Sequence, residues 1–211
     1  MSILFTQGWN IIHGKEEQYA DFIADEYIPQ CNKIGLRSVG GFYVVVGTGP
    51  RIISVKSTET LEELSVILSE KIFKNITLDL KEFIVNYESK ILTPTGRVKH
   101  EKYEIQKGVW KFNQYYDLIP GMKDEYADFI INEYIPTIEK LDFVYITGGW
   151  NVIIGGISEI IAEFTFKNPV DIGRLLDHDD YRNLTNILCN EYVSNYTSRI
   201  MRTTERYERA R

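Results

Sequence analysis

The segment Tyr19–Pro29 reads YADFIADEYIP, and the segment Tyr126–Pro136 reads YADFIINEYIP, so nine of eleven positions are identical at a spacing of 107 residues. The spacing grows to 108 between FKNIT and YRNLT, and to 109 between NYESKIL and NYTSRIM. Such a slow drift is expected from single-residue insertions in loops, which cost little. The chain is therefore predicted to contain two copies of one unit, residues 1–97 and 109–211, joined by a linker at 98–108.

The composition predicts a packed protein that does not enter a membrane. Hydrophobic residues make up 44% of the chain, which is ample for a core. No apolar run reaches the roughly 18 residues that a membrane helix needs. The N-terminal residues MSILFTQGWN lack the basic and apolar regions of a signal peptide. We therefore expect a cytoplasmic protein without membrane contact.

The charges and the cysteines disfavour several kinds of partner. The net charge is −6, and neither half of the chain has the basic surplus that phosphate backbones attract. Nucleic acid is therefore not an expected partner. Cys31 and Cys189 occupy non-equivalent places in the two copies, which argues against a disulfide or a duplicated metal site. Three scattered histidines make a histidine-based metal site improbable, and we expect no metal.

Each copy has the pattern of a strand, a helix, a hairpin, a second helical region and a last segment that fits either a helix or a strand. The opening LFTQGWNII alternates as a strand does. The helix that follows carries an apolar stripe, and Pro29 and Pro136 are expected to kink it or to end it. VGGFYVVVG and RIISVKS in the first copy predict a hairpin. A fourth strand would complete a ferredoxin-like β-α-β-β-α-β unit.

These features together resemble the dimeric α+β barrel superfamily, a ferredoxin-like group. The resemblance rests on the helix with EYIP, the glycine-rich hairpin and the NY motif before the last segment, and it spans both copies. In that superfamily two four-stranded sheets, usually from two chains, pack face to face with helices outside. The resemblance implies an α+β fold in which two tandem ferredoxin-like units form a pseudo-dimeric α+β barrel within one chain. Further association into a homodimer is left open.

The duplication preserves one carboxylate in the apolar stripe of the first helix of each copy. At 100° per residue, Glu26 falls among Tyr19, Phe22 and Tyr27, and Glu133 holds the equivalent place. A carboxylate in an apolar stripe must be partnered or have a raised pKa. Glu26 and Glu133 are therefore candidate catalytic acids or bases, and we expect both to point from helix to sheet and at least one to be mostly buried beside a cavity. A structural hydrogen bond to backbone near the proline is the alternative.

The first strand of each copy supplies the candidate ligand-binding residues. Alternation places Gln7 and Trp9 on one face of the first strand, and Gln114 and Tyr116 on the equivalent face of its copy. An amide among aromatic side chains must find a hydrogen-bond partner. A ligand would satisfy this need, and so would neighbouring backbone.

The resemblance also raises the question of haem. In haem-degrading members of the superfamily, an amide on the first strand, a tryptophan and a helix histidine build the site. Gln7 and Gln114 lie near that strand position, and His178 lies in the second helical region of the second copy. The first copy has Glu70 instead of a histidine, and the tryptophan is missing where it is expected. We therefore expect no cofactor.

Two functions fit these observations. The first is the binding of a small apolar or aromatic ligand between aromatic side chains. The alternative is a cofactor-independent oxygenase or isomerase that acts on a small aromatic substrate, since such chemistry needs only a pocket, a proton acceptor and exclusion of water. The sequence has no glycine-rich phosphate-binding fingerprint and no nucleophile elbow that would favour another class of enzyme.

Overall fold

The computed structural model describes residues 2–98, 109–156 and 158–204. Unit 1 has the elements β1 (Ile3–Ile11), α1 (Glu16–Phe22), η1 (Ile23–Tyr27), α2 (Ile28–Lys33), β2 (Arg37–Val46), β3 (Ile52–Thr58), α3 (Leu61–Ser69), α4 (Lys71–Leu80) and β4 (Ile84–Pro94). Unit 2 has β5 (Trp110–Leu118), α5 (Lys123–Phe129), η2 (Ile130–Tyr134), α6 (Ile135–Ile138), β6 (Tyr145–Ile154), β7 (Ile160–Phe166), α7 (Pro169–Asp177), α8 (Asp179–Ile187), η3 (Leu188–Tyr192) and β8 (Val193–Thr203). The last segment of each copy is thus a strand.

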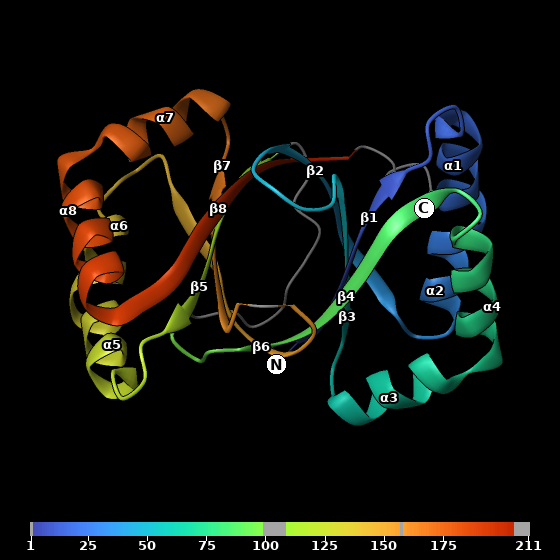
Figure 1. Ribbon diagram of the computed structural model, residues 1–211, viewed down its shortest axis with the longest axis horizontal. Helices are drawn as coiled ribbons and strands as arrows, with labels where there is room; N and C mark the ends of the chain where they lie inside the picture. Colours follow the sequence, from blue (N-terminus) through green and yellow to red (C-terminus); the bar gives the residue numbers. More distant parts are fainter. Residues whose placement is uncertain (1, 99–108, 157, 205–211) are drawn as a thin grey trace.

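The strands form one closed barrel. Each unit builds a four-stranded antiparallel sheet, in the order β4-β1-β3-β2 in unit 1 and β8-β5-β7-β6 in unit 2. Two further antiparallel pairs, β2 with β8 and β4 with β6, join the two sheets. Figure 1 shows the helices of the two units on opposite outer sides of the barrel. The predicted fold, two tandem ferredoxin-like units in a pseudo-dimeric α+β barrel, is confirmed.

The barrel pairing gives every sheet edge a partner from the other unit. The division into units 1–97 and 109–211 remains our proposal. Most of the expected linker at 98–108 lies outside the described residues.

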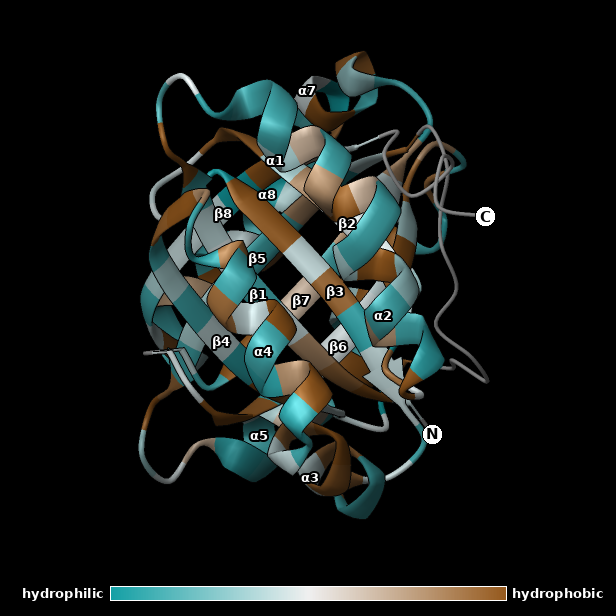
Figure 2. Ribbon diagram, turned by 90° about the vertical axis from the view of Figure 1, so that its right-hand side faces the viewer, coloured by the Kyte–Doolittle hydropathy of each residue, from teal (hydrophilic) through white to brown (hydrophobic). Residues whose placement is uncertain are grey.

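Side-chain alternation along the strands separates three cores. In β1, Phe5 and Trp9 pack against the helices of unit 1, whereas Leu4 points into the barrel. Figure 2 shows α1, α2 and α4 lying over the sheet of unit 1. Unit 2 has an equivalent helix–sheet core, and the third core fills the barrel itself. None of the helices in the described part of the chain is long and apolar enough to cross a membrane.

The helix that carries the repeated motif continues past its proline. In both units a single π-helical turn precedes the proline, at η1 and at η2. The Ile28 N–H donates to the Ile23 carbonyl in unit 1, and the Ile135 N–H donates to the Ile130 carbonyl in unit 2. Such a wider turn is one of the recognised ways in which a helix accommodates an irregularity. The prolines therefore mark a local change of helix geometry, and they do not end the helix.

The repeated NY motif near the start of the last strand has a backbone explanation. Asn86 and Asn195 have φ angles of 55° and 53°, in the left-handed region that asparagine tolerates better than most residues. Close by, the pairing of β1 with β4 shifts register between Gly8 and Asn10, and β5 with β8 shifts at the equivalent place. The asparagine thus forms part of an irregularity that both copies retain.

Candidate functional site: two related helix–sheet pockets

Gln7 is the centre of a buried polar cluster in unit 1. It is 1% exposed and points from β1 toward the helices. Its Oε1 accepts hydrogen bonds from the Tyr27 hydroxyl at 2.9 Å and from Lys56 Nζ at 2.6 Å. Its Nε2 donates to the Tyr87 hydroxyl at 2.7 Å. Gln7 therefore connects η1, β3 and β4 through one amide.

Lys56 is the most unusual member of this cluster, because its charge is fully buried. Nζ donates to Ser54 Oγ at 2.8 Å and lies 4.6 Å from the centroid of the Tyr27 ring. Burial lowers its pKa from 10.5 to about 8, an effect that the nearby Cys31 thiol opposes. Among the described residues no carboxylate forms an ion pair with Lys56. A buried cation without an anionic partner is costly.

Aromatic side chains surround the cluster and leave a small cavity. Trp9 Nε1 donates to the Tyr19 hydroxyl at 2.9 Å, and the Trp9 ring stacks on Tyr87. A cavity of about 10 Å³ is lined by the Trp9 and Tyr19 rings, together with Tyr27, Ser54 and Thr204. This volume holds one water molecule.

Unit 2 repeats the arrangement with a different polar content. Gln114 is fully buried, and its Nε2 donates to the hydroxyls of Tyr181 at 2.9 Å and Tyr134 at 3.2 Å. The hydroxyls of Tyr116 and Tyr126 lie 2.9 Å apart, in place of the Trp9–Tyr19 bond of unit 1. Burial raises the pKa of each of these four tyrosines. They are neutral at physiological pH and act as hydrogen-bonding groups, without the capacity to act as a base.

The cavity of unit 2 is larger and more apolar. It measures about 30 Å³, and its lining includes four aromatic residues, Tyr116, Tyr126, Tyr134 and Phe164. Thr95, Arg97 and Val98, which follow β4 of unit 1, complete the lining. We call residues 95–98 the strap.

The strap is held against the hairpin of unit 2. The Thr95 N–H donates to the Gly149 carbonyl at 2.8 Å, and the Arg97 guanidinium lies 5.1 Å from the centroid of the Tyr126 ring. In unit 1 the Thr204 N–H makes the equivalent bond to Gly41 at 2.7 Å. Each pocket is thus closed by the chain that leaves the last strand of the other unit.

Strand register identifies the residues that replace one another in the two pockets. Gln7 pairs with Ser54 across β1 and β3, and Gln114 pairs with Ala162 across β5 and β7. Two residues further along, Lys56 in β3 corresponds to Phe164 in β7. Unit 1 is therefore polar where unit 2 is apolar.

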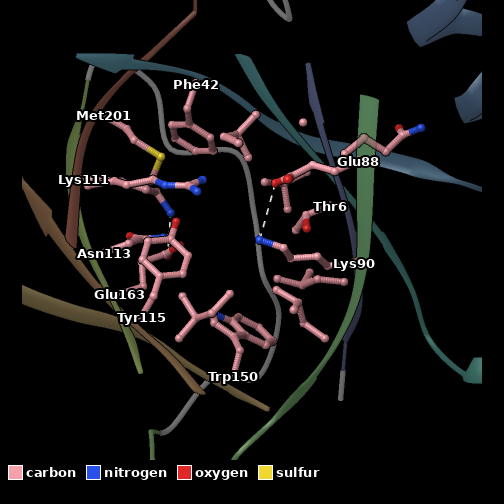
Figure 3. Close-up of a pocket in the computed structure, with 18 of the residues that line it drawn as sticks. Thr6, Phe42, Glu88, Lys90, Lys111, Asn113, Tyr115, Trp150, Glu163 and Met201 are labelled. Carbon is pink, nitrogen blue, oxygen red and sulfur yellow. Dashed lines mark hydrogen bonds and ion pairs between the residues drawn. The ribbon is translucent and has the colours of Figure 1, made fainter. Parts of the chain in front are cut away.

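A third cavity lies inside the barrel (Figure 3). It measures about 40 Å³. Lys111 and Glu163, both almost fully buried, form an ion pair on its unit 2 side, and Thr147 donates to the same Glu163 oxygen at 3.0 Å. Asn113 Oδ1 is buried without a hydrogen-bond partner among the described residues. Such a polar cavity is large enough for ordered water.

Solved structures share this architecture. No protein-family model matches the chain, and no curated protein matches it either. A candidate monooxygenase from Lactobacillus acidophilus NCFM superposes with a TM-score of 0.64 at 8% identity, over 95% of this chain and 92% of its own. An anthrone oxidase-like protein superposes with a TM-score of 0.64 at 9% identity, over 96% and 91%. A chlorite dismutase variant from Candidatus Nitrospira defluvii gives 0.65 at 9% identity, over 99% and 93%.

This chain has the fold of a dimeric α+β barrel, with both halves in one chain. At identities of 8–9%, the likeness shows the fold alone. The chemistry has to be inferred from the residues of this chain. Of the sequence-predicted ligand-binding residues, Trp9 lines the cavity of unit 1 and Tyr116 lines that of unit 2. Gln7 and Gln114 line neither of these two cavities; each hydrogen-bonds to a tyrosine that does, Tyr27 and Tyr134.

The prediction that at least one of Glu26 and Glu133 is mostly buried beside a cavity is wrong. Both residues are exposed, and neither lines the two helix–sheet cavities described above. The reason is the π-helical turn, in which each residue rotates by less than the 100° of an α-helix. Tyr27 therefore lies above Tyr19 on the buried face, and the preceding carboxylate stays in solvent.

His178 lies at the junction of α7 and α8 and is not part of the lining of the three cavities. In the described part of the barrel, no three His, Cys, Asp or Glu side chains gather into a metal site.

The sequence analysis did not identify Lys56. In the alternating stretch RIISVKS, the lysine lies on the same face as Ser54, and two polar residues on one face indicate a face in contact with solvent. The signal that would have found it is the second copy, where SEIIAEFTF has phenylalanine at that place.

Proposed function

We propose that this protein binds a small aromatic or apolar molecule between helix and sheet, with the pocket of unit 2 as the principal site. The observation that carries this proposal is the cavity beside Tyr116, Tyr126 and Tyr134, which combines an apolar lining with neutral hydroxyl groups. Ligand pockets typically have this composition. A ligand larger than the present 30 Å³ space enters when the strap moves away from the Gly149 hairpin.

The test fills the cavity and measures binding of a neutral aromatic probe. Ala162 lines the cavity on β7, so Ala162→Leu should fill it and weaken binding of 2-naphthol at least tenfold in isothermal titration calorimetry. Ala127→Leu is the matched control, because Ala127 lies on α5 outside the lining and should leave the affinity unchanged. Equal binding by the Ala162→Leu variant and the unmodified protein would exclude the pocket of unit 2.

A second candidate function is a cofactor-independent oxygenase or isomerase for a small aromatic substrate. Lys56 favours it, because an amine with a pKa of about 8 can accept a proton near neutral pH. The names of two structural neighbours, a candidate monooxygenase and an anthrone oxidase-like protein, support the same class. In such a reaction Lys56 removes a proton from the substrate, and dioxygen is the oxidant.

Anthrone is a suitable probe for this second function, since its reaction with one dioxygen gives anthraquinone and water. With the protein present, anthraquinone should form faster than in buffer alone, and the Lys56→Met variant should not increase the rate. A rate equal to that in buffer would argue against oxidation of this substrate class, while binding of 2-naphthol would remain a separate question.

A further inference from the structure

The fold does not require a charged residue at the position of Lys56. In unit 2, Phe164 takes the place of Lys56 and Ala162 that of Ser54, on a sheet with the same register. The position of Cys31 on α2 is taken by Ile138 on α6, at the 107-residue spacing of the repeated helix. The chain itself therefore shows that this helix–sheet core can be built from apolar residues. A lysine at this place needs another explanation, because an unpaired buried charge opposes folding.

The immediate surroundings of Lys56 do not neutralise it. The titratable groups that face it are Cys31 from α2, Tyr27 from η1 and, through Gln7, Tyr87 from β4. Burial raises the pKa of the Cys31 thiol and of the Tyr87 hydroxyl, so both stay protonated near neutral pH. The ammonium group is thus surrounded by neutral partners in the described part of the chain.

The hydrogen bonds of Lys56 leave capacity for an anion. Nζ donates to Gln7 Oε1 and Ser54 Oγ, which leaves one of its three protons without an oxygen or nitrogen acceptor among the described residues, although the Tyr27 ring lies 4.6 Å away. Ser54 and Tyr27, which both contact the ammonium group, also line the small cavity of unit 1. Trp9 and Tyr19 belong to the same lining, whereas Lys56 itself does not. A cation therefore lies behind an aromatic cavity.

We propose that the pocket of unit 1 binds a small aromatic oxyanion, with Lys56 as its counter-ion and the rings of Trp9 and Tyr19 against its aromatic part. This inference rests on the proposed function, because it assumes that aromatic molecules enter between helix and sheet, and it adds the charge that unit 1 selects. The Thr204–Gly41 bond closes the present 10 Å³ cavity, so this contact separates when the ligand enters. Unit 2, with Phe164 at the same place, selects neutral molecules.

The test compares an anion with its neutral isostere in the full-length protein. Benzoate should bind at least tenfold more weakly to Lys56→Met than to the unmodified protein, whereas benzamide should show no such difference. 4-Nitrophenolate tests whether a phenolate satisfies the site as well as a carboxylate. Lys56→Gln is a second neutral variant, so that the result does not depend on whether one particular variant folds.

A spectroscopic readout identifies the group that responds. In protein labelled with ¹³C at lysine Cε, the Lys56 resonance is the one missing from Lys56→Met. Benzoate should raise the pKa that this resonance reports by about one, which corresponds to tenfold tighter binding to the charged amine. An unchanged Lys56 titration, or equal benzoate binding by all three proteins, would overturn the proposal.

The two proposals fail separately. If 2-naphthol binds and Ala162→Leu weakens its binding, while benzoate leaves the Lys56 resonance unchanged, the oxyanion proposal is wrong and the proposal for the pocket of unit 2 is supported. If benzoate shifts Lys56 and 2-naphthol does not bind, the oxyanion site is supported and the pocket of unit 2 is wrong. Absence of both effects overturns both.

Discussion

Replacing Lys56 by methionine should stabilise the protein near neutral pH, although a buried, hydrogen-bonded side chain is removed. The fall in the pKa of Lys56 from 10.5 to about 8 corresponds to a penalty of about 3 kcal/mol. The lost bonds to Gln7 and Ser54 offset this by about 1 kcal/mol each. The expected net gain is about 1–2 kcal/mol at pH 7, measured by urea denaturation.

The sign of the pH dependence gives an independent check. Because the pKa of the base is lower in the folded state, the unfolded chain binds more protons between pH 8 and 10.5. The penalty is complete below pH 8 and disappears as the pH rises to 10.5. The advantage of Lys56→Met should therefore shrink through this range. An advantage that stays constant with pH would show that desolvation of the charge is not its cause.

Gln7 and Gln114 form a natural pair for a second stability comparison. Gln7→Leu leaves Lys56, Tyr27 and Tyr87 without their shared partner, one of them charged, so we expect a cost of at least about 3 kcal/mol. Gln114→Leu affects only the hydroxyls of two tyrosines and should cost less, about 1–2 kcal/mol. Urea midpoints measure both, and the reverse order would contradict the polar cluster described for unit 1.

At the scale of helices and strands, alternation predicted the strands well, because each strand has one face on the helices and one in the barrel. The same reasoning placed Gln7 and Gln114 on the correct face. The corresponding reasoning for helices failed for Glu26, because a rotation of 100° per residue does not describe a π-helical turn. Strand alternation also failed to identify Lys56 as buried, since a polar residue in an alternating strand is expected to face solvent until the helix that covers it is known.

The strap and the glycine beneath it provide a prediction at this scale. A Cβ on Gly149 would lie 2.9 Å from Thr95 Oγ1 and 3.2 Å from Val98 Cγ2. Gly149→Ala should therefore push the strap outward and speed the association of 2-naphthol several-fold in stopped-flow fluorescence. Gly173→Ala on α7 is the control, because its added Cβ has no neighbour within 4 Å. Unchanged association in Gly149→Ala would mean that ligands enter by another route.

The whole molecule depends on the pairing of its two halves, and this can be tested by separating them. Residues 1–97 alone would expose the unpaired edges of β2 and β4, together with the apolar barrel face that includes Leu4, Phe42 and Val55. Large exposed apolar faces and open edges drive association. We therefore expect the fragment to self-associate, with β2 of one copy pairing with β4 of another, as β2 pairs with β8 in the intact chain.

The two fragments should differ in how tightly they self-associate, because their barrel faces differ in the amount of charge that they bury. The face of unit 2 carries the almost fully buried Lys111–Glu163 pair where unit 1 has Leu4 and Val55. The Lys90–Glu88 pair of unit 1 also lines the barrel cavity, but it is more exposed. A homodimer of residues 109–211 would place two Lys111–Glu163 pairs in one interior, and burying charges opposes association. Sedimentation velocity should show tighter self-association for residues 1–97 than for residues 109–211. A monomeric 1–97 fragment that unfolds cooperatively would show that the apolar barrel face does not need a second unit to cover it.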